Sequence, residues 1–220
     1  TGLVAGVAAA ALLGTSSRFL ILANRANIDM MLAFWTTAAF AAFLRGCPLR
    51  RDDPPPRPGW QAAGFALAGV AVLTKGVGAV LFVLGIVTWL AVARGAGSWR
   101  DVAWGRGLLA LAATVAAWAV PVALAAPPEY REAIFFRQTL TRLVDPWTHV
   151  EGWGFYLKTL PLNLLPWTTA LPFAAWAVAR VLRRGGADVD RPGVLFALAV
   201  AGSTFAFFTL LPGKRDYYLL

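Results

Sequence analysis

The sequence predicts an all-α, polytopic membrane protein, and three observations carry that prediction. The 220 residues are 59% hydrophobic with a mean hydropathy of +0.63. Only 14% of them are charged, whereas a soluble domain carries about a quarter charged residues. Apolar stretches long enough to cross a bilayer recur along the chain. Together these features indicate one bundle of about seven transmembrane helices, and we expect residues 1–220 to form a single domain.

The longest apolar stretch covers residues 60–93, and Lys75 is its only charged residue. One helix of about 34 residues would measure ~51 Å, whereas the hydrocarbon core of a bilayer is ~30 Å thick. We therefore predict two spans that are broken at Thr74-Lys75-Gly76. The other predicted spans cover residues 2–23, 30–44, 108–126, 155–179 and 194–211. Because the chain begins and stops inside apolar segments, we expect it to be cut from a longer protein at both ends.

The arginines give the expected orientation. They gather in three connections, within residues 45–57, 94–106 and 180–191. If the Lys75 stretch forms two spans, all three connections share one side, which the positive-inside rule makes cytoplasmic. The net charge of +9 then marks a membrane surface, so no nucleic-acid partner is predicted. The Pro-rich stretch 52–58 reads as a stiff spacer on that side.

The opposite, extracytoplasmic face collects a different set of groups. It holds residues 24–29, the Lys75 turn, a long loop around 127–154 and residues 213–218. Within the loop, the apolar spacing over 129–144 predicts a helix that lies in the membrane interface. We interpret this face as the one that carries function.

Two cationic turns on this face allow two interpretations each. Lys75 is either a lysine that reaches the interface at a hairpin tip or a ligand for an anion, because ammonium groups are good partners for phosphate. Gly76 and Gly78 would allow the backbone to approach such a ligand closely. Lys214-Arg215 is either a solvated loop or a second cationic turn that faces the first. Two facing cationic turns would suit a lipid phosphate or pyrophosphate.

Asp29 and His149 are equally open. Asp29 is either a helix cap that pairs with Arg25 four residues earlier, or a carboxylate that ligates a metal or orients an acceptor. His149 is a lone histidine, and a metal site needs three or four ligands, to which Asp145 and Glu151 lie near enough in sequence to contribute. The sequence contains no Walker loop, dinucleotide fingerprint, nucleophile elbow or paired-cysteine motif, which argues against an enzyme of soluble nucleotides.

Four segments resemble motifs of one family. The run Asn24-Arg25-Ala26-Asn27-Ile28-Asp29 is similar to the R-x-x-x-D junction of bacterial membrane glycosyltransferases with the GT-C fold, the aminoarabinose transferase and protein O-mannosyltransferase-like enzymes. Leu73-Thr74-Lys75-Gly76 matches their L-T-K-G turn. The remaining matches are Arg142 and His149 with residues 153–167, similar to "R-F … H … P-F-W-Y-Y … L-P-W", and residues 212–220, similar to "K-x-x-x-Y-L-L-P".

The resemblance implies an inner-membrane enzyme whose active face is periplasmic. Such an enzyme transfers a sugar, with inversion, from a polyprenyl-phosphate-linked donor to a lipid, glycan or protein acceptor, lipid A modification being one example. By the same analogy Asp29 is catalytic, and His149 binds a divalent metal (zinc, magnesium or manganese). The donor would be bound by Arg25, Lys75, Arg142, Lys214, Arg215, Tyr217 and Tyr218.

Two departures limit the analogy. The family's principal catalytic carboxylate lies in a first extracytoplasmic loop, before Thr1, so we expect residues 1–220 alone to be catalytically incomplete. Asp216 stands where the aminoarabinose enzymes usually carry an apolar residue or proline, which puts their substrate in question. The rival functions are a transporter or flippase of lipid-linked sugars and a structural membrane subunit. A transporter would place polar groups near mid-membrane, whereas here they gather on one face, which favours an interfacial enzyme.

Overall fold

A computed structural model describes residues 3–25, 27–48, 53–94, 96–134, 151–184 and 191–219, and the regular elements in these ranges are helices. The α-helices are α1 (Leu3–Gly14), α2 (Ser17–Ala23), α3 (Ile28–Arg45), α4 (Pro58–Thr74), α5 (Gly78–Trp89), α6 (Trp104–Ala125), α7 (Pro128–Glu132), α9 (Phe155–Asn163), α10 (Leu171–Arg184) and α11 (Arg191–Leu210). Short helical turns are η1 (Leu90–Arg94), η2 (Ala96–Asp101) and η4 (Trp167–Ala170). The predicted all-α membrane fold is confirmed.

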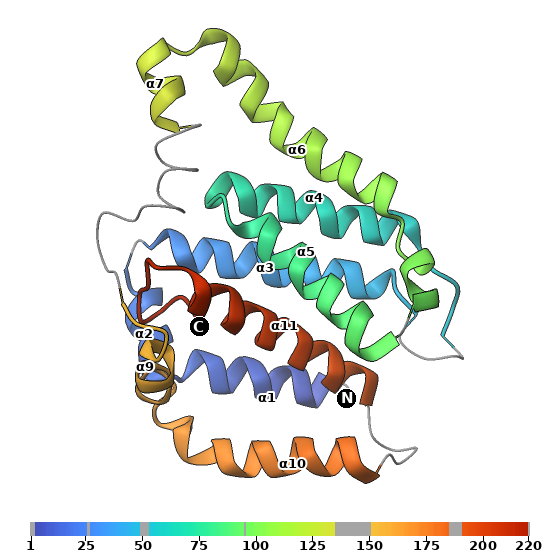
Figure 1. Ribbon diagram of the computed structural model, residues 1–220, viewed down its shortest axis with the longest axis vertical. Helices are drawn as coiled ribbons and strands as arrows, with labels where there is room; N and C mark the ends of the chain where they lie inside the picture. The colour runs from blue at the N-terminus through green and yellow to red at the C-terminus, as the bar shows by residue number, and fades with distance from the viewer. Residues whose placement is uncertain are drawn as a thin grey trace.

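The break at Lys75 lies where the length argument placed it. Helix α4 ends at Thr74, Lys75 itself is extended (φ −158°, ψ 119°), and α5 begins at Gly78 and runs back along α4 (Figure 1). The hairpin is tight because a Cβ on Gly78 would lie 2.6 Å from the Cβ of Ala71. Gly78 therefore allows α4 and α5 to pack closely. The space beside it, which was predicted to admit a ligand, is occupied by α4.

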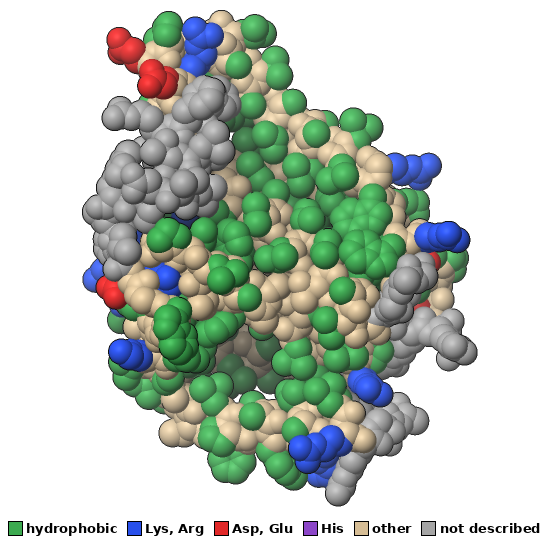
Figure 2. Space-filling view, viewed as in Figure 1, with side chains coloured by type: hydrophobic (Ala, Val, Ile, Leu, Met, Phe, Trp, Pro, Cys, Tyr) green, Lys and Arg blue, Asp and Glu red, His purple; other side chains and the backbone are tan. Residues whose placement is uncertain are grey.

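This hairpin gives the bundle two different ends. The connections from α3 to α4, from α5 to α6 and from α10 to α11 share one end, which we call the arginine-rich end (Figure 1). The opposite end holds α2, α9, the turn between α4 and α5, and residues 211–219, and we call it the working end (Figure 1). In Figure 2, Lys and Arg side chains line the edge at the arginine-rich end, and the surface between the ends is mainly hydrophobic. The two-span prediction had implied this arrangement.

Helices α3, α6 and α11 are each long and apolar enough to cross a membrane. Helices α1 and α2 would make a fourth span, but they meet at a bend of 76°. The stretch 2–23, predicted as one span, therefore consists of two helices that meet at a sharp bend. At the bend, the hydroxyls of Thr15 and Ser16 donate to the carbonyls of Ala11 and Leu13 at 2.6 and 2.8 Å, and such local bonds compete with the helix.

The expected single helix over residues 155–179 was wrong. The chain forms α9, then a turn with η4, then α10. Pro161 lies inside α9 and Pro166 lies in the turn, and proline cannot donate the backbone hydrogen bond that would continue a helix. Of the predicted interfacial helix, α7 covers the start, and residues 135–144 lie outside the described residues.

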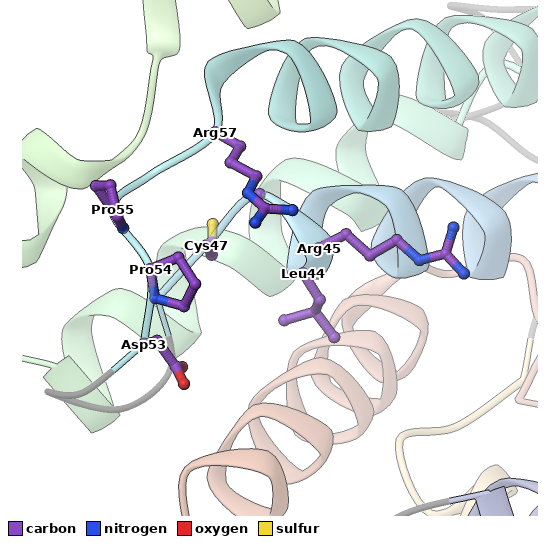
Figure 3. Close-up of a pocket in the computed structure, with 8 residues that line it drawn as sticks. Leu44, Arg45, Cys47, Asp53, Pro54, Pro55 and Arg57 are labelled. Carbon is purple, nitrogen blue, oxygen red and sulfur yellow. The ribbon is translucent and has the colours of Figure 1, made fainter.

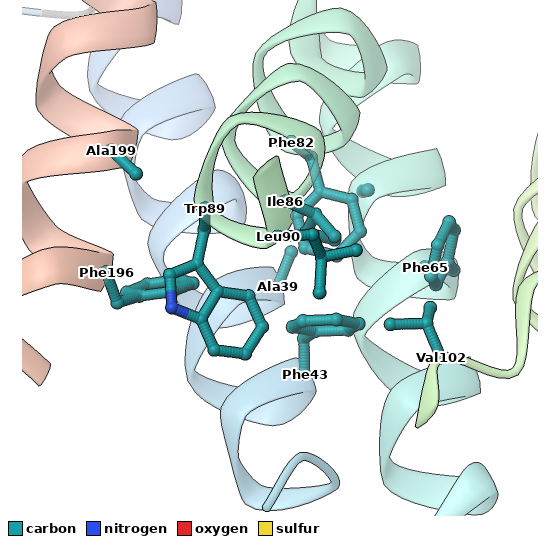
Figure 4. Close-up of a cluster of buried hydrophobic side chains, with 11 residues drawn as sticks. Ala39, Phe43, Phe65, Phe82, Ile86, Trp89, Leu90, Val102, Phe196 and Ala199 are labelled. Carbon is teal, nitrogen blue, oxygen red and sulfur yellow. The ribbon is translucent and has the colours of Figure 1, made fainter. Parts of the chain in front are cut away.

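Two clusters of apolar side chains hold the bundle together. The larger one is aromatic: the ring of Phe43 meets those of Phe65, Phe82 and Trp89 edge to face, at centroid distances of 6.2, 5.8 and 6.5 Å (Figure 4). It joins α3, α4, α5 and, through Phe196, α11. The second cluster lies under the working end and consists of Leu32, Ala71, Val77, Leu81, Tyr156 and Phe208. The site described below rests on this second cluster.

Candidate functional site

The Lys75 ammonium is the centre of the working end. It forms an ion pair with the Asp29 carboxylate, which lies 46 residues earlier in the chain. The ring of Tyr218 covers the same ammonium, with its centroid 4.2 Å from Nζ. The Lys75 and Asp29 side chains are 28% and 15% exposed, so both reach solvent. Three segments far apart in sequence thus converge on one partly open cation.

The start of α3 places the Asp29 carboxylate. Asn27 is the N-cap residue of α3, and its side-chain oxygen accepts a hydrogen bond of 2.9 Å from the backbone N–H of Asp29. The cap of α3 is therefore Asn27, and not Asp29, for which capping was one of the two interpretations. Asp29 pairs with Lys75 rather than with Arg25, whose side chain is exposed. The Asp29 carboxylate lies in the first turn of α3, where the helix dipole stabilises negative charge.

Lys214 points away from the open surface. Only 4% of the residue is exposed, and its ammonium donates to the backbone carbonyls of Leu211 at 2.6 Å and Glu151 at 2.8 Å. The ammonium thus satisfies a carbonyl that the end of α11 leaves without a helical partner. It also ties the turn after α11 to the segment before α9. A contact between Lys214 and donor phosphate remains a prediction, and it would require these two hydrogen bonds to open.

Arg215 and Tyr217 form a second cationic group next to Tyr218. Arg215 donates from Nη1 to the Tyr217 hydroxyl at 2.5 Å. This hydrogen bond raises the pKa of the Arg215 guanidinium above its ordinary value, while partial burial acts in the opposite direction, so the group stays charged. The rings of Tyr217 and Tyr218 meet edge to face at 5.6 Å. Arg215 therefore lies beside the Lys75 centre.

Three residues that hold this turn were not predicted to belong to the site, although Asp216 was noted as a departure from the family pattern. Arg18 of α2 forms an ion pair with the Asp216 carboxylate, 198 residues later, and its guanidinium carbon lies 5.5 Å from the centroid of the Tyr217 ring. Asn163, at the end of α9, donates to the backbone carbonyl of Asp216. A signal for Arg18 was available, because it is a lone charge inside the apolar stretch 2–23.

Comparison with known proteins identifies the family. The family model for dolichyl-phosphate-mannose-protein mannosyltransferase matches residues 3–132. The chain belongs to this mannosyltransferase family.

Curated relatives carry the name undecaprenyl phosphate-alpha-4-amino-4-deoxy-L-arabinose arabinosyl transferase. That of Pseudomonas aeruginosa (strain LESB58) is 29% identical over 203 residues, which cover 89% of this chain and 34% of the relative. Form 1 of Proteus mirabilis (strain HI4320) is 31% identical over 213 residues, 93% of this chain and 36% of the relative. This member of the mannosyltransferase family thus spans about a third of the length of the curated relatives it matches.

A solved structure shows the same fold. It is described as ArnT from Cupriavidus metallidurans bound to undecaprenyl phosphate, and it matches with a TM-score of 0.76 and 27% sequence identity. The match covers 95% of this chain and 36% of that one. The predicted resemblance to aminoarabinose transferases and to mannosyltransferase-like enzymes is therefore confirmed.

Two residues predicted for the site of this mannosyltransferase family member are not placed. Arg142 and His149 lie outside the described residues. In the part of the chain that is described, no three His, Cys, Asp or Glu side chains gather in a way that could hold a metal ion. The divalent metal therefore remains a prediction that depends on His149.

The mannosyltransferase family member also has a cavity at the arginine-rich end, remote from Lys75. It measures about 230 Å³ and lies at the connection from α3 to α4 (Figure 3). Its lining comprises Leu44, Arg45, Gly46, Cys47, Asp53, Pro54, Pro55 and Arg57. The backbone N–H of Arg57 donates to the Gly46 carbonyl at 2.9 Å, so the predicted spacer folds back on α3. The convergence of charged groups that suits phosphate lies at the working end.

Proposed function

We propose that the chain forms part of a membrane glycosyltransferase. This enzyme would transfer a sugar from a polyprenyl-phosphate-linked donor to a lipid, glycan or protein acceptor at the periplasmic face of the inner membrane. The observation that carries the proposal is the partly open Lys75 ammonium between Asp29 and Tyr218. It occurs in a fold that matches, with a TM-score of 0.76, a structure described as bound to undecaprenyl phosphate.

The charges at Lys75 suit the departure of a lipid phosphate. When the bond between the sugar and the phosphate breaks, negative charge grows on the phosphate oxygens. A fixed cation at that position stabilises the transition state more than the ground state. Lys75 would supply this cation, and Arg215, which stays charged, lies near enough through the two tyrosines to add to the positive potential.

The ion pair between Lys75 and Asp29 suggests a role for the Asp29 carboxylate that depends on donor binding. A phosphate that binds to Lys75 competes with Asp29 for the ammonium, so donor binding would free the carboxylate. Asp29 could then orient the acceptor hydroxyl or take its proton while the acceptor oxygen attacks the anomeric carbon. One displacement of this kind forms one bond as the other breaks and inverts the configuration. The principal carboxylate that the family resemblance implies would lie outside residues 1–220.

A divalent metal remains part of the proposal through His149. Such an ion, when bound, would add Lewis-acid stabilisation of the leaving phosphate. The roles of Lys75 and Asp29 described above do not depend on it.

The test uses the full-length protein in proteoliposomes with radiolabelled undecaprenyl-phosphate-linked aminoarabinose, and with the mannose donor in parallel. We expect sugar transfer by the wild type, and a loss of roughly 100-fold in kcat/KM for Lys75→Ala, the scale seen when one oxyanion-stabilising group is removed. Asp29→Asn should lower kcat. Arg131→Ala is the matched control, since Arg131 is a half-buried cation of α7 whose guanidinium donates to the backbone carbonyl of Ala123, away from Lys75.

Two outcomes would contradict the proposal. Full transfer by both Lys75→Ala and Asp29→Ala variants would remove the site assignment. Movement of the labelled lipid across the bilayer without transfer by the wild type would instead identify a flippase.

A further inference from the structure

We infer that Arg18 and Asp216 are positioning residues that hold Tyr218 against the Lys75 ammonium. The inference rests on the proposed function, because it assigns these residues a role in binding the donor phosphate. Neither residue touches the Lys75 ammonium in the described contacts. They act through the turn that follows α11.

Helices α2 and α9 both hold this turn through hydrogen bonds to Asp216. Its carboxylate accepts from Arg18 of α2, and its backbone carbonyl accepts from Asn163 of α9, a residue that is only 7% exposed. Helix α2 is itself linked to the turn that follows α9, because the backbone N–H of Ser17 donates to the carbonyl of Leu165 at 2.7 Å. Side chain and backbone of one residue are therefore fixed to one common support.

The contacts that fix Asp216 also constrain Tyr218, which lies two residues later in the chain. The Tyr217 ring is contacted by the guanidinium groups of Arg18 and Arg215, whose central carbons are 5.5 and 5.9 Å from its centroid. The Tyr218 N–H donates to the Arg215 carbonyl at 3.2 Å, which closes the turn. The Tyr218 ring then packs on Phe208 at 5.1 Å and covers Lys75. A shift of Asp216 would carry the ring away from the ammonium.

The exposure of the pair argues for a geometric role over a stabilising one. The Arg18 and Asp216 side chains are 27% and 35% exposed, and ion pairs in contact with water contribute little to global stability. A purely structural reading is that Asp216 only neutralises an arginine at a membrane boundary. That reading predicts that replacing both residues with apolar ones, Arg18→Met with Asp216→Leu, leaves the turn and the donor KM unchanged. The positioning role predicts that both change.

Limited trypsin digestion of the full-length protein reports on the turn without any need for activity. Trypsin cleaves after Lys214 and Arg215, which are buried and half-buried. We expect Arg18→Ala and Asp216→Ala each to raise the rate of this cleavage about tenfold, because local opening exposes the sites. The double alanine variant should match the single ones, since both remove one interaction. Swapping the charges, Arg18→Asp with Asp216→Arg, should restore protection of the bonds after Lys214 and Arg215 and protect the additional trypsin site at position 216 as well, and Arg131→Ala should not change cleavage in this turn.

Donor kinetics then link the turn to the site. In the single alanine variants we expect the donor KM to rise about fivefold to tenfold with kcat changed less than twofold, the pattern of lost binding common to ground and transition states. Restoration of KM by the charge swap would support the inference. Wild-type protection and wild-type KM in both single variants would overturn it, as would unchanged values in the apolar double variant. If neither the wild type nor any variant transfers sugar but the trypsin pattern holds, the proposed function fails and the positioning of the turn stands.

Discussion

The two ends of the bundle are fastened by opposite kinds of interaction. At the arginine-rich end the amide of Gln61 is fully buried; its nitrogen donates to the carbonyls of Gly46 at 2.9 Å and Asp101 at 2.8 Å, and its oxygen accepts from the N–H of Ala103 at 2.7 Å. At the working end the corresponding links are ion pairs that reach water. The arginine-rich end is therefore held by a neutral, buried amide, whereas the working end adds charged, accessible ion pairs to buried bonds such as that of Asn163.

The two kinds of bond are expected to differ in role: the buried bonds of Gln61 stabilise the fold, and the accessible ion pairs can exchange partners. A buried amide that has its partners cannot give one up without leaving a polar group unsatisfied, so the Gln61 end is expected to be static. The ammonium of Lys75, whose side chain is 28% exposed, can exchange a carboxylate for a phosphate, because both are anions and water has access to the site. The chemistry is thus expected where the links can be exchanged.

Replacing the buried amide should give the largest effect. Gln61→Leu removes three buried hydrogen bonds, two donated to the carbonyls of Gly46 and Asp101 and one accepted from the N–H of Ala103, and we expect a loss of about 3 kcal/mol in unfolding free energy. Thermal unfolding in detergent measures it. Asn24→Leu is the matched control, because this exposed amide makes one bond to the Leu20 carbonyl and its loss should cost less than about 0.5 kcal/mol. Equal losses for the two variants would erase the contrast between the ends.

Replacing Lys75 should reduce ligand binding more than stability, the reverse of what is expected for Gln61. Lys75→Ala should weaken the binding of undecaprenyl phosphate by roughly tenfold or more, as expected for a lost charge-assisted contact. Its unfolding free energy should fall by no more than about 1 kcal/mol, because the pair is partly solvated. Binding by microscale thermophoresis and unfolding measured on the same preparation test both halves. A large loss of stability with unchanged binding would make Lys75 a structural lysine.

Ionic strength should also affect the two ends differently, with a smaller change in binding than the replacement of Lys75 gives. Raising ionic strength from 0.05 to 0.5 M shortens the Debye length severalfold, so undecaprenyl phosphate binding should weaken by about threefold to fivefold. The unfolding temperature should hardly move, since the Gln61 bonds carry no charge. Sodium chloride and potassium chloride should act alike. Salt-independent binding would mean that the phosphate is held by uncharged groups.

The smallest effect is expected for an exposed cation at the arginine-rich end. The Arg45 guanidinium lies 5.2 Å from the centroid of the Trp60 ring. Arg45→Leu should cost about 0.5 kcal/mol, the scale of an exposed cation–π contact, and leave undecaprenyl phosphate binding unchanged. A change in binding at this end would show that the two ends are coupled.

Much of the fold could be predicted, because a bilayer restricts the lengths of apolar helices. The break at Lys75 follows from the length of residues 60–93 alone. The bend at Thr15 and Ser16 did not, because hydropathy takes no account of hydroxyls that bond the preceding turn. The break in residues 155–179 could have been predicted from Pro161 and Pro166.

The candidate site was predicted as a set of residues on one face, without their pairing. Topology placed Asp29, Lys75 and Tyr218 together, and the structure adds that they touch. The Arg18–Asp216 pair could not be predicted in this way, since it joins residues 198 apart and depends on how α2 turns after the bend. Arg142 and His149 stay predictions because they lie outside the described residues.

The short helix α4 has a consequence for how a donor would be reached. Its 17 residues rise ~26 Å, close to the ~30 Å of hydrocarbon, and the tight fold-back at Gly78 leaves no slack beyond it. In the orientation proposed above, Lys75 would lie at the height of the lipid head groups of the outer leaflet. A polyprenyl phosphate diffusing in that leaflet would meet the ammonium sideways, at its own level, without its tail having to leave the membrane.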